Sequence, residues 1–418
     1  MNFSNEVIEL VKKCEQKAQS QFDRVEEIAL YNQNKVLTAF QNNRVATRHF
    51  SNTTGYGYDD IGRDTLCKLF AEIFNAEDAL VSPNIVSGTH ALTLMLFGVL
   101  RPNDNFMYIS GTPYDTLREV IYGDNIGSLK DFGVNFEAVE LVNGEFDKDT
   151  IKEKMTAKKM KMVVIQRSRG YEWRDALSID KIADIIKFVK SIDKDVIVAL
   201  DNCYGEFVEK LEPTSVGADL LAGSMIKNIG GGIAPTGGYI VGNKNLIEQV
   251  AYRLTAPSIG NEVGSYNSSY QPFYQGLFLA PTVTSNAIKT SILFGYVFNE
   301  LGYKTSPSLD SNCYDIIRSI QFNTADELIK FIQTVQFASP IDSYVTPMPW
   351  EMPGYQDDVI MAAGTFVSGA SIELSADSPI REPYIAYLQG GLTYEHGKLA
   401  VLMCANEILK QRKKLSKF

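Results

Sequence analysis

Short runs of apolar residues alternate with longer amphipathic segments through the middle of the chain. The apolar runs predict strands near 78–86 and at 106–110, 134–141, 162–166, 196–201, 219–225 and 237–242. The amphipathic segments carry apolar residues at helical spacing and predict helices at 63–75, 89–100, 116–123, 148–158 and 178–192. Uninterrupted apolar strands between helices are typical of a mostly parallel sheet that helices cover on both faces.

The two ends of the chain predict further elements. Residues 4–31 form an amphipathic pattern, and a polar, irregular stretch follows to about residue 63. After the last strand, residues 281–303 predict a long helix. Residues 304–418 mix short strand-like pieces with two helices, at 324–335 and about 395–413. We therefore expect an α/β protein with a second, smaller α+β domain.

The composition of the chain restricts the classes of function that it can have. The 418 residues are 45% hydrophobic and carry 40 basic against 50 acidic side chains, a net charge of −10. This size favours two domains, and the acidic balance disfavours nucleic-acid binding. Five scattered cysteines and three histidines predict neither a disulfide framework nor a metal site. The N-terminus lacks an apolar leader and no run is long enough to span a membrane, so we expect a cytoplasmic protein without membrane association.

Two neighbouring segments, 196–207 and 220–232, carry the strongest chemical signal. An apolar strand delivers Asp201 at its C-terminal end, and Ser224 and Lys227 follow in a Ser-x-x-Lys pattern before a glycine run. Open α/β sheets bind ligands at the C-terminal ends of their strands. Because Lys227 has no charged neighbour in the sequence, we expect partial desolvation, a lowered pKa and an amine suited to Schiff-base chemistry. The alternatives are a turn or cap role for Asp201 and a solvated lysine.

Two further positions suit a phosphate-bearing aromatic cofactor. Ser87, Gly88 and Thr89 lie between a predicted strand and the start of a helix, where backbone N–H groups bind phosphate. Tyr114 follows the strand 106–110, where it is placed to stack on a cofactor ring. Local helix capping explains the first pattern equally well, and half-buried packing explains the second.

In this order, these signals resemble the fold-type I pyridoxal-phosphate enzymes, in particular the cystathionine/methionine γ-lyase group and its methionine γ-lyase-like, aluminium-resistance branch. The resemblance covers the chain beyond about residue 30 and is carried by residues 54–66, 86–92, 199–207, 223–242 and 371–398. It implies an N-terminal helical arm at 1–50, a cofactor-binding large domain with a mostly parallel seven-stranded sheet at 51–290, and a small α+β domain at 291–418.

The resemblance also implies roles for residues that bind the cofactor. Lys227 is similar to the lysine that holds pyridoxal 5'-phosphate covalently, and Asp201 to the partner of the pyridinium nitrogen. The phosphate ligands implied by the resemblance are Ser87, Gly88, Thr89 and Ser224.

The remaining implied roles concern the substrate and the neighbouring subunit. Tyr114 resembles the tyrosine that stacks on the ring and protonates a departing thiol. Tyr58 would reach the phosphate of a neighbouring subunit, so a homo-oligomer is expected, with a dimer as the active unit and a tetramer as the assembly. Arg381 is the candidate for the substrate carboxylate, with a surface or interface salt bridge as its alternative.

Several residues depart from the pattern of the group. Tyr58 is followed by two aspartates where the lyases have Tyr-x-Arg, and Arg63 is a candidate replacement. Arg167 and Arg169 stand where the lyases carry an acidic segment, which would bring positive charge near the cofactor hydroxyl or the substrate. His90 is a competitor for the stacking position. These departures concern the substrate more than the cofactor.

The expected function is a carbon–sulfur lyase that eliminates a thiol from a methionine-, cystathionine- or cysteine-like amino acid, giving a 2-oxo acid and ammonia. The sequence does not separate β- from γ-elimination. Two alternatives stay open: another pyridoxal-phosphate reaction, such as transamination or γ-replacement, and a cofactor-binding stress-response protein with little turnover.

Overall fold

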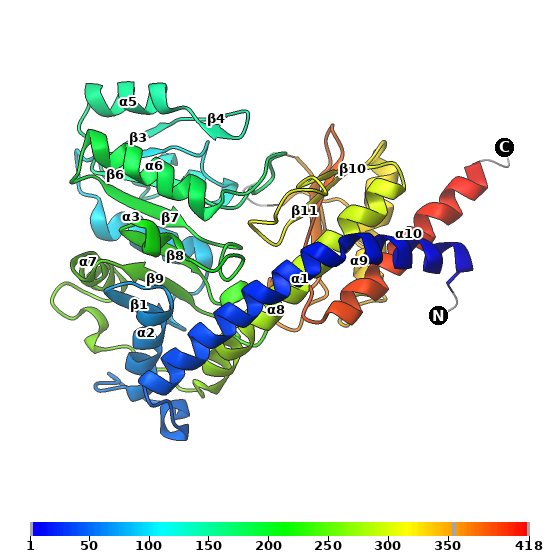
Figure 1. Cartoon of the computed structure of the whole chain (residues 1–418). Helices are drawn as coiled ribbons and strands as arrows, with labels where there is room; N and C mark the ends of the chain where they lie inside the picture. The colour runs from blue at the N-terminus through cyan, green and yellow to red at the C-terminus, as the bar shows by residue number, and fades with distance from the viewer. Residues whose placement is uncertain (1–2, 353–356, 416–418) are drawn as a thin grey trace.

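A seven-stranded sheet forms the centre of the larger part of the protein. The computed structural model describes residues 3–352 and 357–415 (Figure 1). In spatial order the strands are β1 (Asp78–Ser82), β9 (Gly238–Gly242), β8 (Leu220–Ser224), β7 (Ile197–Asp201), β6 (Met162–Gln166), β2 (Asn105–Tyr108) and β3 (Asn135–Ala138). Only β9 runs against its neighbours. The prediction of a mostly parallel sheet is confirmed.

Helices cover both faces of this sheet. Successive strand residues point to opposite sides, and the side chains on both sides are apolar and need to be buried. Within β6, Met162 and Val164 join one apolar core, and Val163 and Ile165 join the other. The first core is completed by α3 (Gly88–Val99), α4 (Asp115–Tyr122) and α7 (Lys244–Leu254). The second is completed by α2 (Ile61–Ile73), α5 (Lys148–Ala157), α6 (Ile179–Ile192) and parts of α1 and α8.

A second sheet lies at the C-terminal end of the chain. Its five strands are antiparallel, in the order β10 (Lys304–Ser306), β11 (Arg318–Gln321), β14 (Ile385–Gln389), β13 (Ser375–Pro379) and β12 (Val359–Ala362). Two helices pack on it, α9 (Ala325–Ala338) and α10 (Tyr394–Leu415). This arrangement confirms the expected α+β character of the C-terminal part.

Two long helices connect the two sheets. α1 (Asn5–Asn42) and α8 (Gln271–Glu300) lie side by side along the molecule (Figure 1). Each of them contributes side chains to the core of the large sheet and to the core of the small sheet. The division into arm, large and small domain therefore stays a proposal, since α8 runs through the proposed boundary at residue 290.

Three helices differ from the sequence prediction. α1 continues beyond residue 31 to Asn42, because the buried Asn32 side chain donates hydrogen bonds to the Phe207 and Glu209 carbonyls, contacts invisible in the local pattern. α8 begins ten residues before Pro281, since burial of its first turns offsets the cost of an internal proline, about 3 kcal/mol. α7 was not predicted, although Ile247, Val250 and Ala251 form its buried face.

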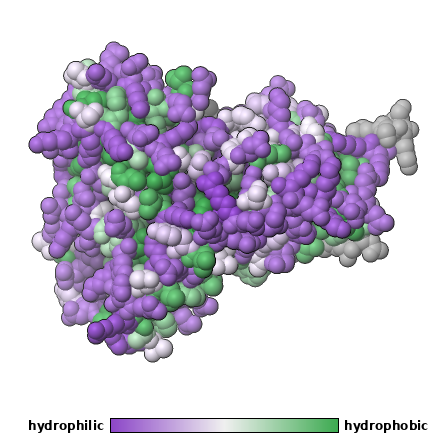
Figure 2. Space-filling model, viewed as in Figure 1, coloured by the Kyte–Doolittle hydropathy of each residue, from purple (hydrophilic) through white to green (hydrophobic). Residues whose placement is uncertain are grey.

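The remaining short elements are the two-stranded sheet of β4 (Leu141–Val142) and β5 (Glu145–Phe146), and the 3-10 turns η1 (Thr47–Phe50), η2 (Pro213–Val216), η3 (Asn228–Gly230) and η4 (Gly260–Glu262). The face shown in Figure 2 is mostly hydrophilic, with smaller hydrophobic patches between the hydrophilic residues. Within the described ranges, none of the helices is sufficiently long and apolar to cross a membrane.

Candidate active site

Asp201 is the last residue of β7 and lies at the C-terminal edge of the large sheet. Its side chain is buried, and Oδ1 accepts a hydrogen bond from the Cys203 N–H at 3.0 Å. Gln166, the last residue of β6, is its direct neighbour in the strand register. A buried carboxylate is thus fixed at the strand ends, where this class of sheet binds ligands.

Lys227 lies in the tight turn that follows β8. A side chain at Gly230 would bring its Cβ within 1.6 Å of the Met225 carbonyl oxygen, so the turn requires glycine there. The lysine is partly buried, and its Nζ lies 4.1 Å from the centre of the Tyr204 ring. The turn therefore directs the amine back over the edge of the sheet, beside the loop that follows β7.

The acidic surroundings of Lys227 correct the expectation of a lowered pKa. Burial acts to lower the pKa of the amine, but the acidic groups around it outweigh burial and raise the pKa above its ordinary value. In decreasing order these groups belong to Cys203, Tyr204, Asp201 and Glu206. The local sequence shows the uncharged neighbours of the lysine, whereas the acids come from the loop after β7.

Lys227, Asp201 and Tyr114 line one cavity of about 90 Å³ between the two sheets. Tyr114 precedes α4, and its backbone N–H donates to Gln166 Oε1 at 3.2 Å. Its ring lies 5.8 Å from the ring of Tyr171. The other lining residues are Gln166, Ser168, Gly170, Tyr171, Cys203, Tyr204, Ile317, Asp377, Tyr387 and Gln389. The structure thus brings Tyr114 together with Asp201 and Lys227, which were predicted from separate segments of the sequence.

The four candidate phosphate ligands gather beside this cavity. Ser87 caps α3 by accepting the His90 N–H at 3.0 Å, and the first N–H groups of the helix have no acceptor within the helix. A Cβ placed on Gly88 would lie 3.3 Å from Ser224 Cβ and 3.5 Å from Cys203 Sγ. The Thr89 hydroxyl is 3.0 Å from that of Thr116. A helix N-terminus and two serines therefore lie close to a cavity-lining cysteine.

His90 is turned toward the chain before the helix. Its Nδ1 accepts the Val86 N–H at 3.2 Å, and burial lowers the pKa of the imidazole. His90 is not among the residues that line the Lys227 cavity, whereas Tyr114 is. The expectation that His90 competes for the stacking position is not supported by this arrangement.

Arg381 lies at the outer mouth of the site. A second cavity, of about 130 Å³, shares Tyr114, Gln166, Gly170 and Tyr171 with the first and is also lined by Arg381. The Arg381 guanidinium is half exposed and forms an ion pair of 2.8 Å with Asp357. The residue thus reaches the entrance, where its charge is shared with a neighbouring carboxylate.

Tyr58 and Arg63 lie away from the cavity of their own chain. The Tyr58 side chain is 62% exposed, with its ring 5.6 Å from that of Tyr56. Arg63 is buried, and its guanidinium bonds to the Asp64 carboxylate at 2.9 Å and to the Gly57 carbonyl at 3.1 Å. Arg63 therefore holds the loop that presents Tyr58.

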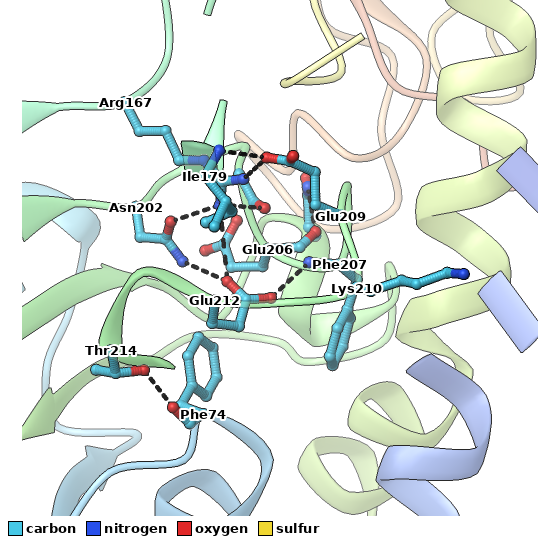
Figure 3. Close-up of polar contacts among 12 residues, drawn as sticks. Phe74, Arg167, Ile179, Asn202, Glu206, Phe207, Glu209, Lys210, Glu212 and Thr214 are labelled. Carbon is cyan, nitrogen blue, oxygen red and sulfur yellow. Dashed lines mark hydrogen bonds and ion pairs between the residues drawn. The ribbon is translucent and has the colours of Figure 1, made fainter. Parts of the chain in front are cut away.

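The guanidinium groups of the two arginines after β6 bind other groups of the same chain. The Arg167 guanidinium binds the Asn202 side chain, the Gly205 carbonyl and the Glu209 carboxylate at 2.8–3.0 Å (Figure 3). Arg169 lies along the outer cavity but pairs with the buried Asp315 at 3.3 Å. The expectation that they bring charge to the cofactor or substrate is therefore wrong for Arg167, and Arg169 is neutralised by an acid of the C-terminal part.

Several cavity residues were not predicted from the sequence, among them Asp377. It lies on β13, its Oδ1 has no hydrogen-bond partner among the described residues, and burial raises its pKa to about 7. Tyr171 and Gln389 act against this rise through their hydrogen bonds. No local signal marks Asp377 and Gln389, because strands of the second sheet bring them to the cavity. Within the described ranges, no cluster of three His, Cys, Asp or Glu side chains could hold a metal.

These residues fit pyridoxal phosphate. The helix N-terminus at Gly88 suits the phosphate, the buried Asp201 carboxylate suits a protonated ring nitrogen, and the Lys227 amine suits the aldehyde. The fold is shared with the pyridoxal-phosphate-dependent protein YhfS of Escherichia coli, which superimposes with a TM-score of 0.62 at 14% identity, over 93% of this chain and 97% of that one. The protein thus has the fold of the fold-type I pyridoxal-phosphate enzymes.

The chain belongs to the methionine gamma-lyase family, whose profile matches residues 7–409. The uncharacterized protein YnbB of Bacillus subtilis is 49% identical over 412 residues, which cover 97% of this chain and 98% of YnbB. The structure of a carbon–sulfur lyase involved in aluminium resistance from Clostridium novyi is also 49% identical, with a TM-score of 0.94 over 97% of this chain and 96% of that one. Membership of the family implies pyridoxal phosphate as cofactor and an amino acid as substrate.

Proposed function

We propose that this protein is a pyridoxal-phosphate-dependent carbon–sulfur lyase that converts a sulfur amino acid and water into a thiol, a 2-oxo acid and ammonia. The observation that carries the proposal is that Lys227, Asp201 and Tyr114 face one cavity at the strand ends. The family and the lyase description of the Clostridium novyi relative support the reaction class. Methionine-, cystathionine- and cysteine-like amino acids are the candidate substrates.

The cofactor is proposed to be held at three points. Lys227 carries it covalently, Asp201 keeps its ring nitrogen protonated, and the phosphate is bound at Ser87, Gly88, Thr89 and Ser224. When bound, pyridoxal phosphate supplies an electron sink for the bonds around the amino-bearing carbon of the substrate. The Cys203 N–H fixes the Asp201 carboxylate at 3.0 Å, which supports an orientation held before the cofactor binds.

Lys227 and Tyr114 are proposed to move the protons of the reaction. The Lys227 amine, once released by the substrate, takes the proton from the substrate Cα; for elimination at the γ-position it would pass this proton on and then take a second one from Cβ. Tyr114 stacks on the cofactor ring and gives a proton to the departing sulfur. The acidic groups around Lys227 support this role, because they stabilise the amine in its protonated form.

Arg381 is proposed to bind the substrate carboxylate. A guanidinium offers two parallel N–H donors, which suit a carboxylate. Its position at the entrance supports the role, although its present partner is Asp357. Substrate binding would therefore exchange one carboxylate partner for another.

The active unit is proposed to be a dimer within a homotetramer, with Tyr58 contacting the phosphate in the neighbouring subunit. The exposure of Tyr58 and its absence from the cavity of its own chain support a role toward a second copy. A cytoplasmic location stays a prediction from the sequence.

The decisive experiment compares the wild type with Lys227→Ala, using Lys210→Ala as the control for an exposed lysine in a nearby loop. We expect wild type and control to show near-visible cofactor absorbance and to retain the cofactor covalently after borohydride reduction, whereas Lys227→Ala does not. Thiol, 2-oxo acid and ammonia should be released from a sulfur amino acid by the first two only. A wild type that stays colourless with added pyridoxal phosphate contradicts the proposal.

The same assay separates the alternatives. Conversion of the bound cofactor to a stable amine form by an amino acid, without thiol release, indicates transamination. Incorporation of an added thiol indicates γ-replacement. Covalent cofactor with no product from any sulfur amino acid indicates a cofactor-binding stress-response protein with little turnover.

A further inference from the structure

Glu206 is a fully buried acid that the proposed reaction does not use. It follows Asp201 in the loop after β7, and its Oε1 accepts a hydrogen bond of 2.7 Å from the Tyr239 hydroxyl of β9. Its other oxygen, Oε2, is buried and has no hydrogen-bond partner among the described residues. Leaving a buried carboxylate oxygen unsatisfied costs stability, so its retention calls for a reason.

The Glu206–Tyr239 pair lies behind the turn that carries Lys227. Tyr239 is opposite Gly223 in the β8–β9 register, and a Cβ on Gly223 would lie 2.6 Å from the tyrosine hydroxyl oxygen. The hydroxyl thus rests against the end of β8. On the other side, the Asn228 side chain donates to the Glu206 carbonyl at 3.0 Å, which ties the loop of Glu206 to the residue after Lys227.

A neighbouring acid shows how Glu206 differs. Glu212 accepts hydrogen bonds from the Phe207 N–H at 3.0 Å and the Asn202 side chain at 3.2 Å, and lies 3.7 Å from the Arg167 guanidinium (Figure 3). Glu212 therefore has both donors and a counter-ion. Glu206 accepts from one side chain, that of Tyr239, and no ion pair is found for it in the part of the chain that the structure describes.

The charge of Lys227 acts on Glu206. Burial raises the pKa of Glu206 to about 8; the Tyr239 hydroxyl and its own backbone N–H oppose this rise, Glu212 adds to it, and Lys227 opposes it. Glu206 in turn is one of the acids that favour the charged form of Lys227, and this effect develops as Glu206 ionises around pH 8. The other acidic groups facing the lysine are those of Cys203, Tyr204 and Asp201, all from the same loop and strand.

We propose that Glu206 is a positioning residue for Lys227, acting from behind the cavity wall: in its ionised form, held by the Tyr239 hydroxyl, its carboxylate stabilises positive charge on the lysine nitrogen. Glu206 is not among the residues that line the cavity, so it acts through its electric field rather than through contact with the substrate. This inference rests on the proposed role of Lys227 as the residue that carries the cofactor.

The test is the pH dependence of the near-visible absorbance of the cofactor-loaded protein. Glu206→Gln keeps an acceptor for the Tyr239 hydroxyl and removes the charge, so the transition of the band should move to lower pH by about one unit. Tyr239→Phe removes the donor that stabilises the ionised Glu206 and should move the transition in the same direction. The double variant should shift no further than Glu206→Gln, because both changes remove the same charge. Glu212→Gln is the matched control, with no shift to lower pH expected, because Glu212 raises the pKa of Glu206.

The outcomes distinguish this inference from the proposed function. An unmoved transition in Glu206→Gln and Tyr239→Phe, whatever their melting temperatures, overturns the role of Glu206 and leaves the lyase proposal standing. Equal shifts in Glu206→Gln and Glu212→Gln also overturn it, because the effect would then not be specific. A wild type without a lysine-linked band overturns both proposals.

Discussion

The amine of Lys227 lies over the face of Tyr204, 4.1 Å from the ring centre. The Tyr204 hydroxyl accepts a hydrogen bond of 2.8 Å from Ser371, which lies between the strands of the second sheet. The backbone of Tyr204 adopts a left-handed conformation, φ 69°, which is rare for a residue with a side chain. A strained residue and a long-range hydrogen bond thus place the ring beneath the lysine.

Replacement of Tyr204 should show that the ring matters more than the hydroxyl. A cation over an aromatic face gains about 0.5–2 kcal/mol, so Tyr204→Leu should weaken cofactor binding by about tenfold. Tyr204→Phe keeps the ring and should bind the cofactor nearly as well as the wild type. Titration of the cofactor-free protein with pyridoxal phosphate measures both. Equal losses in the two variants would assign the effect to the Ser371 contact instead.

Substitutions of Arg381 and of Asp357 should change KM in opposite directions. Arg381→Leu removes the proposed carboxylate ligand and should raise KM by tenfold or more, with a smaller change in kcat, since a charged hydrogen bond contributes about 1.5–3 kcal/mol. Asp357→Asn releases the arginine from its 2.8 Å ion pair and should lower KM. Steady-state kinetics on one sulfur amino acid decides. An unchanged KM in Arg381→Leu would leave Arg381 as a surface ion pair.

Asp377 should make stability depend on pH. Burial raises its pKa in the folded protein from 3.8 to about 7. A carboxyl with a raised folded pKa contributes stability below its unfolded pKa, and this contribution is lost as the pH rises toward the folded value. Asp377→Asn should therefore gain on the wild type by roughly 2 kcal/mol between about pH 5 and about pH 8. Urea unfolding of the cofactor-free proteins at the two pH values measures this gain, and a pH-independent difference would contradict it.

Subunit mixing tests the proposed reach of Tyr58. If Tyr58 serves the neighbouring site, a dimer of one Lys227→Ala chain and one Tyr58→Ala chain contains one intact site. Random re-association of equal amounts should then recover about a quarter of the wild-type activity from two defective proteins. A mixture of either variant with itself is the control. No recovery, with exchange verified by mass spectrometry, would place Tyr58 outside the neighbouring site.

The sheet was predictable because its strands are buried on both faces, so that each is a continuous apolar run between turns. The ends of the helices were harder to predict from the sequence. Asn32 looks like a surface residue in the sequence, yet its amide binds two carbonyls some 175 residues away. Pro281 indicates a helix start by local rules, and only the packing of Phe273 and Leu277 on the large-sheet core keeps the helix intact before it.

The residues of the candidate site also fall into some that the sequence predicts and some that it does not. Asp201 and Lys227 were predictable because Asp201 ends one strand of the large sheet and Lys227 follows the next, and the ends of such strands meet at a common edge. Asp377 and Tyr387 reach the cavity from an antiparallel sheet whose position relative to the first is set by long-range packing. The direction of the Lys227 pKa was mispredicted for the same reason, since the acids around it are not its sequence neighbours.

The pairing of α1 with α8 affects how the protein unfolds. Val36 and Ala39 of α1 and Phe273 of α8 belong to the core of the large sheet, while Val11 of α1 and Phe294 of α8 belong to that of the small one. Loss of packing in either core therefore also removes contacts of α1 and α8, which contribute to both cores. Heating should therefore melt the chain in one cooperative transition rather than two, and the cavity between the sheets should vanish together with both of them.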